Sequence, residues 1–219
     1  MLPRGRSLRT RTAVILMSAV SAIAFAALAV RLGPHAPGGC GRSADSSWYE
    51  KQLDKRKESL KFDEWREKLP GKKVESLEFS TSDFAPYAVT LEDISFTKDD
   101  RRYTLLDERR RKLGSVDINL FKSSAEARKC LLVGSHQIFA PLAFGLPKKG
   151  SKYEIGDVSL CGTRIGPRDE LADKPVLAIM FIRNNVWACV TYDDTSKVVE
   201  MAKAIDDRLV AALVDDTGE

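Results

Sequence analysis

The stretch "PVLAIMFIRNNVWACVTY", residues 175–192, holds two apolar runs on either side of Asn184-Asn185. Asparagine tolerates the positive φ that a two-residue turn requires, so the stretch predicts a β-hairpin. Both faces of its strands are apolar, and the hairpin should therefore lie in the middle of a sheet that is covered on both sides, or on one side and partly by a helix. The pairs expected across it are Phe181 with Ala188, Ile179 with Val190, Leu177 with Tyr192, Ile182 with Trp187, Met180 with Cys189, and Ala178 with Thr191.

Two stretches with helical periodicity can supply that cover. Residues 195–213 are the more regular, because their apolar side chains recur at three- and four-residue steps, and Asp193 or Asp194 can cap their first turn. Residues 124–137 are the second predicted helix, with Ser123 and Glu126 in the spacing of a capping box. The apolar positions of the last helix are Val198, Met201, Ala202, Ile205, Leu209 and Ala212.

Residues 74–121 have the short β-branched and aromatic runs of strands, separated by charged or glycine-containing turns. In "GSVDINLF", residues 114–121, apolar side chains alternate with Asp117 and Asn119, which predicts one face in contact with water. Strands and helices in this order predict an α+β fold, with an antiparallel sheet packed by helices. A charged stretch with helical spacing, residues 47–69, precedes the sheet and ends at "LPGKK".

Residues 13–30, "AVILMSAVSAIAFAALAV", run for 18 positions without a charge. A spanning helix needs about 17 to 25 apolar residues, so this run is just long enough. Arg4, Arg6, Arg9 and Arg11 precede it, and the positive-inside rule then keeps the N-terminus in the cytoplasm and exports the rest. We predict a signal-anchor helix whose partner is the lipid bilayer, with a cleaved signal peptide as the alternative.

The alternative depends on two small-x-small sites, at Ala24-Phe25-Ala26 and Ala27-Leu28-Ala29. A lipid-attached Cys40 is a third reading, which Pro37 and the distance from the apolar run disfavour. The protein is therefore expected to be membrane-anchored on the extracytoplasmic side, or secreted if the signal is cleaved. The expected divisions are a basic cytoplasmic segment (1–12), the signal-anchor (13–30), a Gly- and Pro-rich linker (31–45) and one α+β domain (46–219).

The charge of the exported part argues against a nucleic-acid partner. Residues 1–44 contain six arginines and no acidic residue, so the other 175 residues have 29 basic and 31 acidic side chains, a net charge of −2. The one dense basic run is "DERRRK", residues 107–112, and it is typical of a solvated hairpin tip.

The residues that could carry chemistry are few. Cys40, Cys130, Cys161 and Cys189 have no partner at metal-binding spacing, and His136 is the one histidine beyond the linker, so no catalytic, metal or cofactor site is predicted. Beyond the membrane, thiols are no longer kept reduced. Cys161 and Cys189 both fall in predicted strands, which makes them the first candidates for a disulfide, with Cys130 as the competing partner for either one.

Three functions fit these observations. The first is a non-catalytic module, membrane-anchored or secreted, that binds a protein or an envelope component. The second is a secreted enzyme that uses Cys130 or the acidic residues of "GDVSLCG" and "GPRDELADK". The third is a carrier of a small ligand, with an apolar pocket lined by Trp187 and Met180 if no helix fills that face of the sheet.

Overall fold

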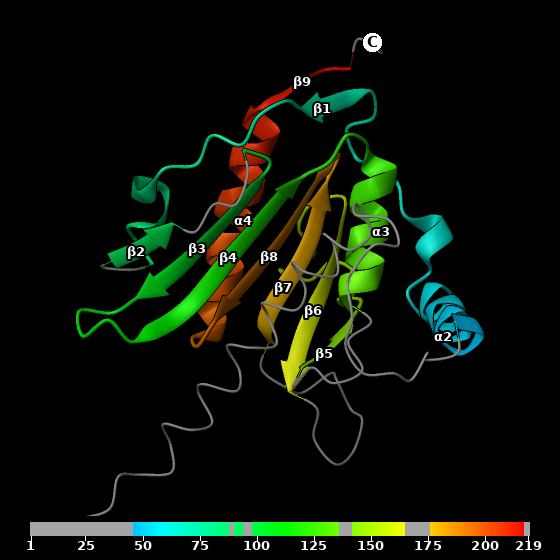
Figure 1. The fold of residues 1–219 in the computed structure, drawn as a ribbon, viewed down its shortest axis with the longest axis horizontal. Coiled ribbons are helices and arrows are strands. Elements are labelled where there is room, and N and C mark those ends of the chain that lie inside the picture. The colour runs from blue at the N-terminus through cyan, green and yellow to red at the C-terminus, as the bar shows by residue number, and fades with distance from the viewer. Residues whose placement is uncertain (1–45, 88–89, 94–97, 136–141, 165–175, 217–219) are drawn as a thin grey trace, which may run out of the picture.

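The structure is a computed structural model that describes residues 46–87, 90–93, 98–135, 142–164 and 176–216. Its fold is α+β, as the sequence predicts: a seven-stranded antiparallel sheet lies between helices (Figure 1). The strands of this sheet are β2 (Thr90–Asp93), β3 (Asp100–Leu106), β4 (Lys112–Leu120), β5 (Leu142–Gly145), β6 (Val158–Arg164), β7 (Val176–Arg183) and β8 (Val186–Tyr192).

The strand order is β2-β3-β4-β8-β7-β6-β5, so the predicted hairpin, β7 and β8, lies at the centre. Its register agrees with the prediction from the pair Ala178–Thr191 to the pair Ile182–Trp187. Asn184 has a φ of 48°, the left-handed conformation for which asparagine was expected in the turn.

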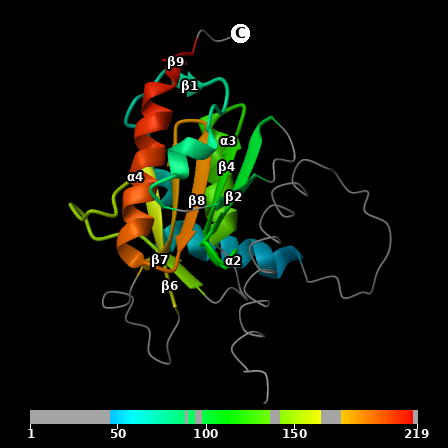
Figure 2. The same ribbon diagram turned by 90° about the vertical axis from the view of Figure 1, so that its left-hand side faces the viewer.

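The two faces of the hairpin are covered by different helices, α3 (Ser124–Ser135) and α4 (Thr195–Ala211). Figure 2 shows them on opposite sides of the sheet. Ile179 and Phe181 pack under α4, whereas Met180, Ile182 and Trp187 pack under α3 with Leu131. These side chains are almost fully buried, and the sheet therefore has two separate apolar layers. The buried side chains of α4 are Val198, Val199, Met201, Ala202, Ile205, Asp206 and Leu209.

The helix ends follow the predicted capping chemistry in part. Asp194 is the N-cap of α4 and accepts a hydrogen bond of 2.9 Å from the backbone N–H of Ser196. At α3, the Ser123 hydroxyl accepts from the backbone N–H of Glu126 at 3.3 Å. The Glu126 carboxylate instead accepts from the backbone N–H of Lys122, one residue before the expected partner.

The charged N-terminal helix is shorter than predicted. Helix α2 spans Ser46–Ser59 and is followed by a 3-10 turn, η1 (Phe62–Glu64). The break comes at Lys61, whose φ of 51° is left-handed, and it lets Leu60 and Trp65 both turn inward against the α3 layer. The change of apolar face within residues 47–69 therefore marks the end of the helix.

The segment after η1 also differs from the strand expected at the start of residues 74–121. Strand β1 (Lys72–Val74) has three residues and pairs with β9 (Leu213–Asp215) in a separate ribbon. The chain then forms a second 3-10 turn, η2 (Thr81–Phe84), with Ser80 and Asp83 in a reciprocal capping box. This local capping competes with strand formation, and it explains why the apolar run at Val74 and Leu77 does not extend the sheet.

The signal-anchor predicted at residues 13–30 lies outside the described residues. Within the part of the chain that the structure describes, no helix combines the length and the apolar character needed to cross a bilayer.

The turn of the central hairpin is held by a buried ion cluster that the sequence analysis did not identify. The Arg183 guanidinium donates to both oxygens of Asp206 at 2.8 and 2.7 Å and to Asp157 at 2.8 Å. Burial alone would lower the pKa of Arg183, but hydrogen bonds and charge from Asp206, then Asp157, outweigh it and raise that pKa. Gly156 has a φ of 67°, and a Cβ at this position would lie 2.2 Å from the carbonyl oxygen of Ile182.

We predict that Asp206→Asn lowers the free energy of unfolding by about 3 kcal/mol, because it leaves the buried Arg183 charge with one carboxylate instead of two. Chemical denaturation with an unchanged m-value measures the loss. Asp207→Asn is the matched control, since Asp207 is the exposed neighbour on the same helix. Equal stability of the two variants would contradict the role given to the cluster.

Candidate functional site

An open depression of about 500 Å³ lies at one end of the sheet. Three parts of the chain form it: the segment after η2, the β3–β4 hairpin tip, and the end of β8 with the first turn of α4. Its volume falls in the range of about 300 to 1,000 Å³ that is usual for ligand sites. The residues that line it are Ala85, Pro86, Tyr87, Asp107, Glu108, Arg109, Arg111, Leu113, Tyr192 and Lys197.

A hydrogen bond, an ion pair and an aromatic contact hold η2 and the segment after it against the sheet and α4. The Tyr192 hydroxyl donates to the carbonyl oxygen of Tyr87 at 2.6 Å. Arg208 of α4 forms an ion pair of 2.9 Å with Asp83 of η2. Phe84 is buried against Tyr103 of β3, with their ring centroids 4.7 Å apart. This wall of the depression is therefore attached to both the sheet and α4.

The hairpin tip forms the second wall, and it is the exposed basic turn expected at "DERRRK". The Asp107 carboxylate accepts from the backbone N–H groups of Arg109 and Arg111 at 2.9 and 2.7 Å, and from the Arg111 guanidinium at 2.6 Å. Hydrogen bonds and charge from Arg111 are the main cause of the lowered pKa of Asp107. Arg109 is exposed, and no described residue pairs with its guanidinium.

The depression contains charges of both signs. Lys197 lies with its Nζ 5.6 Å from the ring centroid of Tyr192, a cation–π distance. Burial, then Asp194 and Asp193, raise the pKa of Tyr192, and burial, then Glu200, raise that of Tyr87. An open site with tyrosines and both kinds of charge suits the polar surface of a larger partner better than an enclosed apolar ligand.

A second polar cluster lies on the α3 face of β3 and β4, away from the depression. Arg102 and Asp117 form an ion pair across these strands, and the hydroxyls of Ser115 and Thr191 lie 2.9 Å apart. Asp117 was expected to face water, but its exposed fraction is 6%. Burial raises its pKa, and the opposing effect of Arg102 is smaller. The alternation of apolar and polar residues along β4 could not reveal the burial of Asp117, because its partner, Arg102, comes from another strand.

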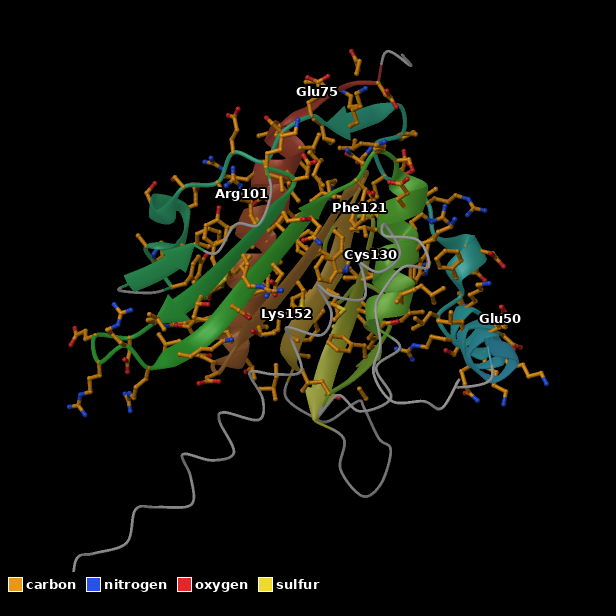
Figure 3. The ribbon with its side chains drawn as sticks, viewed as in Figure 1. Glu50, Glu75, Arg101, Phe121, Cys130 and Lys152 are labelled. Carbon is orange, nitrogen blue, oxygen red and sulfur yellow. The ribbon has the colours of Figure 1, made fainter. Side chains whose placement is uncertain are left out.

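The three described cysteines are free thiols. Cys161 lies opposite Ile179 and packs in the α4 layer, whereas Cys189 lies opposite Met180 and packs in the α3 layer. Strand β7 separates them by two inter-strand spacings, about 9.6 Å, and a disulfide needs Cα atoms within about 7 Å. The predicted Cys161–Cys189 disulfide is therefore not present. Cys130, labelled in Figure 3, projects from α3 and packs in the same layer as Cys189.

Burial determines the chemistry of these thiols. It raises the pKa of Cys130 to about 12, with a further contribution from Asp100, and the pKa of Cys161 to about 11. It also raises the pKa of Cys189, with further contributions from Asp117 and Cys130. A nucleophilic cysteine needs the opposite shift, so none of the three is an activated thiol.

The other expected site residues are accounted for only in part. Asp157, from "GDVSLCG", is bound to Arg183, and His136 and "GPRDELADK" lie outside the described residues. Met180 and Trp187 are buried beneath α3, which fills the face where an apolar pocket was expected. In the described ranges, no group of three or more His, Cys, Asp or Glu side chains could hold a metal ion.

Comparison with known proteins gives little further information. No family model matches the chain, and no curated protein matches it. Among solved structures, the extracellular domain of PknH from Mycobacterium tuberculosis is similar at 13% identity and a TM-score of 0.30, covering 81% of this chain and 100% of that one. A likeness of this size carries no argument about function.

We predict that all three domain thiols resist alkylation in the folded protein. In a Cys40→Ser variant at pH 8, iodoacetamide should leave Cys130, Cys161 and Cys189 unmodified, because at raised pKa values almost no thiolate forms. Unfolding in denaturant without reductant should expose all three, and intact mass spectrometry counts the alkyl groups. A peptide joining 161 to 189, recovered without reduction, would contradict this prediction.

Proposed function

We propose that this chain is a non-catalytic, extracytoplasmic module that binds a protein partner through the depression. The observation that carries this proposal is the depression itself, an open and polar site lined by the exposed Arg109, whose guanidinium has no partner among the described residues. Interfaces between proteins combine a tyrosine- or arginine-containing centre with a polar edge. Tyr87 and Arg109 supply those groups here.

The chemistry of the described residues supports binding over catalysis. The thiols have raised pKa values, and Asp157 and Asp206 are occupied by a buried arginine. In the depression, the Asp107 carboxylate already accepts three hydrogen bonds from its own turn. These carboxylates have structural partners that a general acid or base would have to give up.

The extracytoplasmic location is part of the proposal, and it rests on the sequence of residues 1–31. Four arginines precede the 18-residue apolar run and one follows it directly, the asymmetry that keeps the N-terminus inside. On this proposal, residues 31–45 tether the domain to the outer side of the bilayer.

We expect the protein to remain in the membrane fraction after carbonate extraction, with protease added outside cleaving the domain but not residues 1–12. A retained apolar run of 18 residues gives this topology. N-terminal sequencing is the deciding measurement. A mature chain that starts at Ala27 or Val30 would show cleavage, and export would then lead to secretion instead of anchoring.

Site-specific crosslinking in the producing cell tests the binding function. With the photoreactive residue p-benzoylphenylalanine in place of Glu108, irradiation should give one discrete adduct with another protein, since Glu108 lines the depression. The same residue in place of Lys149, which is exposed in the loop between β5 and β6, the two strands at the opposite edge of the sheet from β2, is the matched control. Equal adducts at both positions would contradict the proposal.

Reversing the charge of Arg109 tests whether this side chain contributes to the same adduct. Arg109→Glu should lower the yield of the Glu108-position adduct about tenfold, which corresponds to about 1.4 kcal/mol of binding free energy. Lys149→Glu changes the net charge equally and should leave the yield unchanged.

A further inference from the structure

The two edges of the seven-stranded sheet differ in the contacts that other described parts of the chain make with them. At the β5 edge, Arg56 of α2 donates to the carbonyl oxygens of Phe144 and Ser135. This arginine joins α2 to the edge strand and to the C-terminal end of α3, and it occupies a backbone acceptor of the edge. At the other edge, β2 pairs with β3, and the described chain places no strand on its outer side (Figure 1). An edge of this kind can accept a strand from another chain.

The register identifies which groups of β2 point outward. The backbone N–H of Leu120 donates to the carbonyl oxygen of Asp99 at 2.8 Å, and in an antiparallel ladder such bonded pairs recur at every second residue. Thr104 therefore directs its backbone groups away from β4 and toward its β2 partner, Glu92. It follows that Leu91 and Asp93 direct theirs to the open edge. Among the described residues, no strand lies beside these two N–H groups and two carbonyl oxygens.

The start of β2 lies close along the chain to residues that line the depression. Tyr87 lines the depression, and β2 begins three residues later at Thr90. On the neighbouring strand, Leu106 pairs with Thr90, and the next residue, Asp107, lines the depression. A chain that lies along β2 thus has one end beside the depression.

We propose that the partner is recognised as an extended peptide segment that adds to the β2 edge as a further strand and places a side chain in the depression. This inference rests on the proposed function and specifies its partner. In strand addition, main-chain hydrogen bonds give affinity and a side-chain pocket gives specificity. The backbone groups of Leu91 and Asp93 provide the main-chain hydrogen bonds. Tyr87, Arg109 and Lys197 line the depression that receives the side chain.

A proline at position 93 distinguishes strand addition at the β2 edge from binding at the depression alone. Asp93→Pro deletes an outward N–H that the ladder with β3 does not use. The preceding residue, Glu92, is extended in the strand, which is the conformation that a following proline favours. Asp93→Ala is the matched control, because it removes the same carboxylate and keeps the N–H.

The readout is the adduct at the Glu108 position in the full chain. Asp93→Pro should lower its yield about tenfold, whereas Asp93→Ala should change it less than about twofold. Thermal unfolding of both variants checks that they fold alike. An unchanged yield in the proline variant would overturn the inference, and so would an adduct whose second component is another copy of this chain. If no adduct forms at Glu108 at all, the proposed function itself fails.

Amide hydrogen exchange on the unmutated strand gives a second test that does not depend on proline. In the purified adduct, exchange at Leu91 and Asp93 should slow at least about tenfold relative to the free chain, because their N–H groups would become hydrogen-bonded. Exchange at Thr90 and Glu92, which already bond to β3, should change less. Uniform slowing across all four residues, or none, would overturn the inference.

Discussion

The bidentate ion pair between Arg183 and Asp206 fixes how the central hairpin meets the rest of the chain. Arg183 is the last residue of β7, and its guanidinium also binds Asp157, whose other oxygen accepts from the backbone N–H of Asn184 at 2.6 Å. One arginine therefore connects the sheet, α4 and the segment before β6. Because all three charges are buried, the cluster is stable only when every partner is present.

The two asparagines extend this connection to the N-terminal side of the domain. Asn184 donates to the carbonyl oxygens of Leu69 and Lys72 at 2.7 and 2.8 Å. Asn185 binds both backbone groups of Val74 and donates to the carbonyl oxygen of Phe121. The turn thus holds β1, and β1 in turn pairs with the C-terminal strand β9. Strand β1 and, through it, the C-terminal strand β9 are thus anchored on the Asn184-Asn185 turn.

Sequence reasoning could recover the features that depend on local periodicity. The central hairpin, its register and the two helices follow from apolar spacing between residues close along the chain, which the 2- and 3.6-residue periods encode. The partners of Arg183, Asp117 and Arg56 could not be recovered in this way. Asp206 lies 23 residues after Arg183, and Ser135 lies 79 residues after Arg56, so no local pattern signals either contact.

The same reasoning explains why the candidate site was missed and the disulfide was misplaced. The depression combines three segments that meet only after the sheet has formed, and its one sequence signal, "DERRRK", is also typical of an ordinary solvated turn. For the cysteines, strand membership suggested proximity, but pairing depends on strand order and on which face each side chain takes. Cys161 and Cys189 differ in both respects.

The depression and the most deeply buried part of the core lie in different regions of the fold. The core is concentrated around β7, β8, α3 and α4, where side chains are almost fully buried and the Arg183 ion pairs join β7 to α4. The β3–β4 hairpin tip lies at the other end of these strands from the Asn184-Asn185 turn, since β4 and β8 are antiparallel neighbours and Gly114 pairs with Tyr192. A binding surface there can vary in sequence at little cost to stability, because exposed loop residues on a rigid scaffold contribute little to the core. Tyr192 links the two regions: its ring packs in the α4 layer, and its hydroxyl holds the wall of the depression through Tyr87.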